Sequence, residues 1–252
     1  MAAIFRLSIK QLAGPRRLLL LLLLAALPVG LAVLVSLTLG EDETSNEEFV
    51  DGLLDGLLVA GVMPIISLVL ATALFGNEVE DRTLSYLVLR PVSRYQIVLA
   101  KLGAALVIGV PLVVLSGVIA TWLGGSGVLG SKVVLLGNDA VAIAAVGIAL
   151  LLGFAAYTAL FTWAGLMSTK ALPYALVYVV LWEGVVSSFL GGIRYLSVRG
   201  YTLGLVHGLD ERSFGELADR VIEFPAALVG VVAVTAGFFL LTVKRLHDMD
   251  VP

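Results

Sequence analysis

The sequence contains no cysteine, only two histidines and few charged residues. The absence of cysteine excludes a disulfide framework, a thiolate metal site and a cysteine nucleophile. Charged residues make up 14% of the 252 residues, whereas an average soluble domain has about 25%. The charges that are present nearly balance, with 16 basic and 19 acidic side chains, so the composition does not predict a nucleic-acid-binding protein.

Long hydrophobic runs make up much of the sequence. Hydrophobic residues account for 60% of the chain, and the mean hydropathy is +1.05. A helix needs about 20 consecutive apolar residues to cross a bilayer. Six membrane-spanning helices are predicted on this basis, over residues 18–39, 57–76, 102–123, 140–168, 171–190 and 225–243. The segments between them are too short for a further domain, so we expect one all-α membrane domain over residues 1–252.

The distribution of basic residues predicts the orientation of these spans. With the N-terminus in the cytoplasm, 11 of the 16 Lys and Arg residues fall in cytoplasmic segments, as the positive-inside rule requires. Four of the other five fall in the longest external loop, 191–224, where the rule is weaker. We therefore expect both termini in the cytoplasm. The first external loop, 41–55, carries seven acids and no basic residue, and we expect it to be solvated.

The residues before the first predicted span have an amphipathic pattern. Apolar and basic residues fall on different sides of a helical wheel: Ile4, Phe5, Ile9 and Leu12 against Arg6 and Lys10. This pattern predicts a helix lying in the membrane interface, ended by Gly14 and Pro15. A basic flank that only fixes the topology is an equal alternative.

The segment 76–101, between the second and third predicted spans, is charged yet patterned. Acidic residues precede the apolar-rich run 84–89, which is too short to cross the bilayer. Pro91 interrupts this run, and Ser93 with Gln96 forms a capping box that starts the next helix. The pattern predicts a helix, a turn and a second helix on the cytoplasmic face.

This segment resembles the ABC-2 type permease family, the membrane subunits of ATP-binding-cassette exporters. The resemblance rests on an acidic residue, a Thr-Leu pair, a Pro-Val-Ser-Arg turn and a lysine, which here are Glu78 or Glu80, Thr83-Leu84, Pro91 to Arg94 and Lys101. The number of predicted spans, the amphipathic N-terminal segment and the long external region before the last span are also similar to this family. Arg82 departs from the pattern, because many members have glycine there.

The resemblance implies that the segment is a coupling helix, which docks onto a separate ATPase subunit. Apolar side chains would anchor such a helix and charged ones would orient it. The candidate residues are Glu78, Glu80, Asp81, Arg82, Thr83, Leu84, Tyr86, Leu87, Arg90, Pro91 and Arg94. An interfacial helix whose arginines bind lipid phosphate is the alternative.

The resemblance also implies ATP-driven export from a prokaryotic cell, across its plasma membrane. ATP and Mg would bind to two copies of the partner ATPase, and a second copy of this chain or a related permease would complete the pathway. Short external helices are expected before the last span, with Arg194, Tyr195 and Arg199 as candidate gate residues.

Glu183 is the only ionisable residue within the six predicted spans. A charged side chain at the centre of a membrane helix costs about 2.5–3.5 kcal/mol on insertion scales, so we expect Glu183 to face the bundle interior or water, near Ser187 one turn on. Both residues are candidates for the transport pathway or a dimer interface. A hydrogen-bonded packing role for the acid is an equal alternative.

Two other functions are weighed against an ABC permease. An ion-coupled secondary transporter is expected to have internal repeats, broken helices or several intramembrane charges, and the sequence offers one acid. An intramembrane hydrolase needs a base or a metal, but His207 and His247 lie outside the predicted spans. Residues 125–132 have the wrong order for a P-loop. We therefore expect no catalytic, cofactor or metal site in this chain. The sequence does not identify the substrate.

Overall fold

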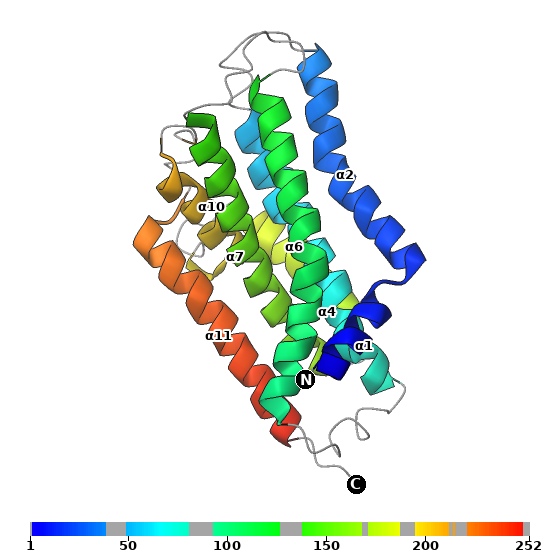
Figure 1. Cartoon of the computed structure of the whole chain (residues 1–252). Helices are drawn as coiled ribbons and strands as arrows, with labels where there is room; N and C mark the ends of the chain where they lie inside the picture. The colour runs from blue at the N-terminus through cyan, green and yellow to red at the C-terminus, as the bar shows by residue number, and fades with distance from the viewer. Residues whose placement is uncertain are drawn as a thin grey trace.

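The computed structural model describes residues 2–38, 49–80, 93–126, 138–167, 171–186, 195–211, 214 and 221–248. These residues form a bundle of helices and contain no strand (Figure 1). The helices are α1 (Ala2–Leu12), α2 (Pro15–Thr38), η1 (Leu53–Val62), α4 (Met63–Glu80), α6 (Arg94–Ser126), α7 (Asn138–Met167), α8 (Ala171–Val177), η2 (Tyr178–Val186), α10 (Val198–Leu209) and α11 (Phe224–Asp248), of which η1 and η2 are π-helical. The N-terminal helix α1 and the last turn of α11 lie at the same end of the bundle.

Five helices are long and apolar enough to cross a membrane, and each overlaps a predicted span: Pro15–Leu37, Phe49–Phe75, Arg94–Leu123, Ala140–Met167 and Phe224–Asp248. The remaining predicted span, 171–190, contains the shorter apolar helix Leu172–Gly184. Its helical elements α8 and η2 have 7 and 9 residues. At about 1.5 Å per residue they extend roughly 24 Å, less than the hydrocarbon thickness of about 30 Å. The count of six spans therefore stays a prediction.

The second membrane helix starts earlier than the sequence predicted. It begins at Phe49 rather than at residue 57, so Asp51 and Asp55 lie in a helix and not in a solvated loop. Asp51 is 8% exposed, and Asp55 pairs with Arg199. Asp51 lies in the first turn, where the helix dipole favours an acid, and the charge of Asp55 is compensated by Arg199, which together make the earlier start possible. The loop prediction was wrong for these two acids.

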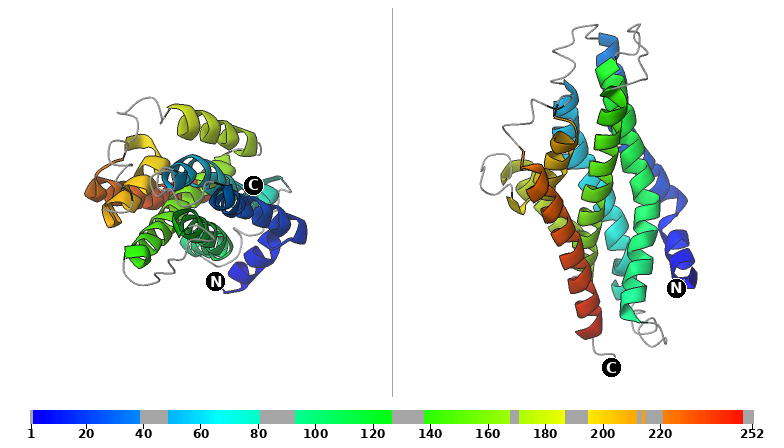
Figure 2. Two further views of the ribbon diagram at one scale, coloured as in Figure 1. Left: turned by 90° about the horizontal axis from the view of Figure 1, so that it is seen from above. Right: turned by 60° about the vertical axis from the view of Figure 1, so that its left-hand side comes forward.

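Helix α7 forms the centre of the bundle, because it packs against α4, α6, α10 and α11. In contrast, α2 and α11 run along opposite edges (Figures 1 and 2). Burial follows this arrangement: within an 18-residue apolar stretch of each helix, 67% is buried in the second membrane helix, against 22% in α2 and 17% in α11. The many exposed leucines of α2 therefore lie on the outer surface of this bundle, a composition suited to contact with lipid.

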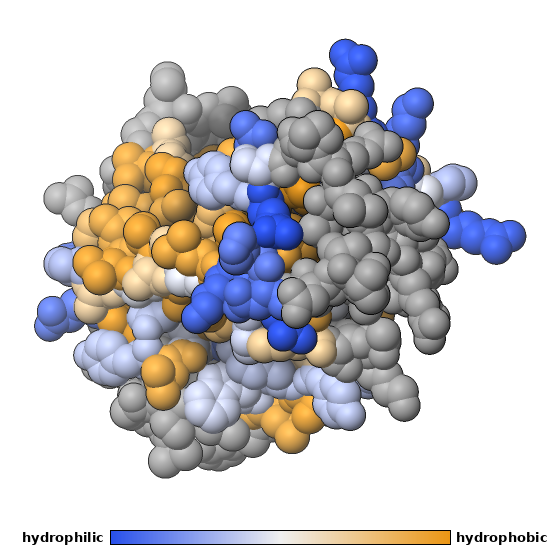
Figure 3. Space-filling model, turned by 90° about the horizontal axis from the view of Figure 1, so that it is seen from below, coloured by the Kyte–Doolittle hydropathy of each residue, from blue (hydrophilic) through white to orange (hydrophobic). Residues whose placement is uncertain are grey.

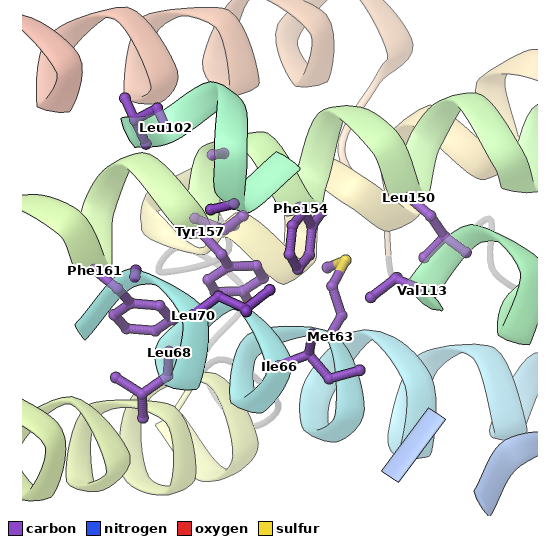
Figure 4. Packing of buried hydrophobic residues seen from close by; sticks show 14 of the residues in the cluster. Met63, Ile66, Leu68, Leu70, Leu102, Val113, Leu150, Phe154, Tyr157 and Phe161 are labelled. Carbon is purple, nitrogen blue, oxygen red and sulfur yellow. The ribbon is translucent and has the colours of Figure 1, made fainter. Parts of the chain in front are cut away.

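The core between α4, α6 and α7 contains both aromatic and aliphatic side chains. Phe154 and Tyr157 of α7 lie toward Met63 and Ile66 of α4 (Figure 4). All four side chains are fully buried. Gly109 allows α6 to pack closely against α7 and α4, since a Cβ at this position would meet the Phe154 ring of α7 and would lie 2.9 Å from Leu70 Cδ1 of α4. Small residues allow close helix packing in membranes, where burial gives little driving force.

The amphipathic N-terminal helix predicted from the sequence is present as α1. It ends at Leu12, and Gly14 separates it from α2, which begins at Pro15. Its buried side chains are Ile4, Ser8 and Leu12, whereas Arg6 and Lys10 are exposed. The helix packs mainly on α6. Its position in the membrane interface remains a prediction.

Candidate functional site

A buried polar cluster joins η1, η2 and the short helix α10. It consists of Asp55, Tyr178, Glu183, Ser197 and Arg199 and is called the polar cluster below. The cluster begins where α10 begins. Ser197 has an extended backbone (φ −111°, ψ 128°), and its Oγ accepts a hydrogen bond of 3.1 Å from the Gly200 N–H. Ser197 is therefore the N-cap that starts α10.

Glu183 provides the centre of the polar cluster. Its side chain is fully buried, and its carboxylate accepts hydrogen bonds from the Tyr178 hydroxyl at 3.0 Å, the Val198 N–H at 3.1 Å and the Arg199 N–H at 3.4 Å. The Ser197 hydroxyl donates to the second carboxylate oxygen. Two of these donors are free N–H groups in the first turn of α10. The acid therefore caps the positive end of that helix.

Arg199 connects the polar cluster to the second membrane helix. Its Nε donates to Asp55 Oδ1 at 2.6 Å, and its Nη1 donates to the Glu183 backbone oxygen at 2.8 Å. Burial lowers the pKa of Arg199, but the hydrogen bond and charge of Asp55, together with smaller contributions from Tyr157 and Glu183, raise this pKa above its ordinary value. The guanidinium is therefore charged throughout the physiological pH range.

Both acids of the polar cluster lie in π-helical segments, Asp55 in η1 and Glu183 in η2. Such segments are rare and are often found at functional sites. Nearby, the fully buried Tyr157 of α7 lies within electrostatic reach of Glu183. Among the described residues, no three Asp, Glu or His side chains gather that could hold a metal ion.

Of the pathway and gate candidates predicted from the sequence, the structure brings only two together. Glu183 and Arg199 meet in the polar cluster, whereas Tyr195 is exposed and its backbone oxygen accepts from the Tyr201 hydroxyl. Ser187 and Arg194 lie outside the described residues. Sequence reasoning missed Asp55, Tyr178 and Ser197. Ser197 had a signal, since a serine before a helix is a preferred N-cap.

Helices α10 and α11 pack closely next to the polar cluster. A Cβ at Gly204 would lie 2.5 Å from the Ile222 oxygen and 2.9 Å from Ala227 Cβ, and a Cβ at Gly208 would meet Phe224. The four-residue spacing of these glycines indicates close packing, and the structure confirms it. The C-terminal half of α10 is therefore fixed by packing, and its N-terminus by polar contacts.

Most of the residues predicted to form a coupling helix lie outside the described residues. This applies to residues 81–92, and Glu78 and Glu80 lie in the last turns of α4. Arg94 is the first residue of α6, directly after Ser93 as the sequence predicted. Its Nη1 donates to His247 Nδ1 at 2.6 Å, so the start of α6 contacts the last turn of α11.

Lys101 ties the two helices that flank residues 81–92. Its side chain is 1% exposed, and its Nζ donates to the Leu74 backbone oxygen of α4. The ammonium also lies 4.6 Å from the centre of the Phe75 ring, a cation–π contact. The lysine of the sequence motif therefore joins α6 to α4.

Basic side chains are exposed at the end of the bundle where α1 and the last turn of α11 lie. They are Arg6, Lys10, Arg16, Lys244 and Arg245. Viewed from this end, hydrophilic residues border an apolar surface (Figure 3). This combination is suited to a membrane interface, where cations contact anionic headgroups.

Comparison with known families identifies the chain. A family model described as ABC-2 family transporter protein matches residues 16–189. The chain belongs to this family. The ABC-2 match includes the segment 76–101 and Glu183 and ends before α10, and it confirms the resemblance seen in the sequence. No curated protein matches the chain. The ABC-2 permease family is a membrane transport component of ABC transporters and is not itself catalytic.

Proposed function

We propose that this chain is the permease subunit of an ABC exporter, and that a separate ATPase subunit drives it through residues 78–94. Membership of the ABC-2 family is the observation that carries this proposal. The five long apolar helices supply the membrane part of a transport pathway. The work of this chain is mechanical: movement of the docked ATPase displaces the helices that flank the coupling segment.

The helices on either side of residues 81–92 support this role. α4 ends at Glu80 and α6 begins at Arg94, both at the end of the bundle that carries α1 and the last turn of α11 (Figure 1). Lys101 and Leu74 connect these helices close to the segment, and Arg94 contacts His247 of α11. A force applied to the segment would therefore reach three membrane helices and not one.

A complete transporter on this proposal contains two permeases and two ATPase subunits. The sequence has no internal repeat, so two-fold symmetry around a pathway would come from a second copy of this chain or from a related permease. The termini, with their exposed basic residues, lie on the cytoplasmic side of a prokaryotic plasma membrane, and substrate moves outward.

Affinity purification from the native membrane tests this proposal. A subunit with a P-loop should co-purify with the wild-type chain, and the complex should hydrolyse ATP. The double variant Arg90→Glu/Arg94→Glu should lower recovery of this subunit by at least about tenfold, because reversed charges at an interface cost several kcal/mol. Wild-type recovery by the double variant would refute docking through this segment.

His247→Ala is the matched control for the Arg94 change. It removes the contact between Arg94 Nη1 and His247 Nδ1 without altering the charge of the segment. Recovery of the ATPase should stay at the wild-type level with this variant. If His247→Ala lowers recovery as much as the double variant, the loss reflects the contact between α6 and α11 rather than docking.

A further inference from the structure

The first turn of α10 depends on an acid from another helix. Its N-cap Ser197 donates to the Glu183 carboxylate, and the N–H groups of Val198 and Arg199 donate to the same carboxylate. A helix of 12 residues is marginal by itself and needs tertiary contacts to persist. The geometry points to Glu183 as the group that supplies these contacts at the N-terminal end.

We propose that Glu183 is a positioning residue that anchors the N-terminus of α10 to the membrane bundle. The carboxylate receives four hydrogen bonds, from the Tyr178 and Ser197 hydroxyls and from two backbone N–H groups of α10. A carboxylate has about four lone-pair sites, so these donors engage both of its oxygens and fix its orientation relative to α10.

The rest of α10 is held in a different way. Thr202 packs against Gly153 of α7, where a Cβ would lie 3.2 Å from Thr202 Cβ, and Gly204 packs against Ala227. These contacts involve no part of Glu183. Loss of the carboxylate should therefore loosen the first turn of α10 and leave its second half packed.

Single cysteines measure this difference, because the natural chain contains none. Val198 lies in the first turn and is 2% exposed, and Leu205 lies in the second half and is 1% exposed. Val198→Cys and Leu205→Cys are each made in the wild-type chain and in a Glu183→Gln chain. The rate of reaction with N-ethylmaleimide is then measured on the full purified chain. Each thiol reacts only when its part of α10 opens.

In the Glu183→Gln chain, the cysteine at position 198 should react at least about tenfold faster, because hydrogen bonds to a charged group are lost. The cysteine at position 205 should keep its wild-type rate. Glu183→Asp retains the charge on a shorter side chain and should restore part of the protection at position 198. An unchanged rate at position 198 would overturn the proposal. Equal acceleration at both positions would also overturn it, since it would indicate general loosening.

This inference rests on the proposed function only in naming the bundle as a transport pathway, and the two fail separately. Glu183 is linked through Arg199 to Asp55, near the start of the second membrane helix, whereas Glu78 and Glu80 lie in its last turns. Glu183→Gln should therefore recover the ATPase from membranes as the wild type does. If the wild-type chain recovers no ATPase, the proposed function fails while the thiol rates still decide the role of Glu183. If the ATPase is recovered and the thiol rates do not change, only the anchoring role fails.

Discussion

Replacing Arg199 should destabilise the protein more than replacing Asp55, although the two residues form one ion pair. Arg199 donates to Asp55 Oδ1 at 2.6 Å and to the Glu183 backbone oxygen at 2.8 Å, and it also attracts the Glu183 carboxylate. One positive and two negative charges give this trio a net charge of −1. Removal of the arginine leaves −2, and removal of the aspartate charge leaves zero.

The expected magnitudes follow from what each substitution leaves behind. Breaking a buried ion pair so that one charge is uncompensated costs about 3–5 kcal/mol. The two side chains are 13% and 16% exposed, so Arg199→Met should fall near the lower limit, at about 3 kcal/mol. Asp55→Asn leaves an amide that can still accept from Arg199, and its cost should be about 1 kcal/mol.

Thermal unfolding of the purified chain in detergent measures the difference. For a chain of this size, 1 kcal/mol shifts the midpoint by roughly 2–4 °C, so Arg199→Met should lower it by roughly 6–12 °C and Asp55→Asn by roughly 2–4 °C. Arg6→Met is the matched control, since Arg6 is exposed on α1 and its loss should change stability by less than about 0.5 kcal/mol.

The double variant Arg199→Met/Asp55→Asn tests whether the charges of Arg199 and Asp55 are energetically coupled. The neutral amide at position 55 leaves only the Glu183 charge without its partner, so the double variant should be more stable than the sum of the single effects predicts. Equal losses from the two single variants would show that charge does not govern this site. Strict additivity would show that Arg199 and Asp55 are not coupled.

Two further predictions use the same unfolding assay. Gly109→Ala should lower the free energy of unfolding by about 1–3 kcal/mol, because the new methyl group meets the buried Phe154 ring. Gly147→Ala is the control and should be close to neutral, since the nearest neighbour of its methyl group would be Val114 Cγ1 at 3.7 Å. Equal effects of the two substitutions would contradict the packing described for α6. Lys101→Met should cost about 1–3 kcal/mol, because its ammonium no longer donates to the Leu74 oxygen or contacts Phe75. Wild-type stability of this variant would mean that Lys101 does not join α4 to α6.

Much of the helical framework could be predicted because its signals are local. Five of the predicted spans are long apolar helices, and the break at Gly14 and the helix start after Ser93 follow from turn and capping chemistry. The start of the second membrane helix could not be predicted in this way. The sequence predicted Asp51 and Asp55 to be loop residues, because the burial of Asp51 and the pairing of Asp55 with Arg199 depend on distant parts of the chain.

Membership of the ABC-2 family and insertion in a membrane follow from the amino-acid sequence, because hydropathy, charge distribution and the motif around Thr83 and Pro91 are properties of short stretches. The polar cluster, in contrast, depends on how the helices pack. Arg199 and Asp55 are 144 positions apart, and Glu183 and Ser197 are separated by 14 positions in the sequence. Such pairs carry no periodic signal along the chain. They exist because the packing of α10 against η1 and η2 brings buried polar groups together, where each needs a partner.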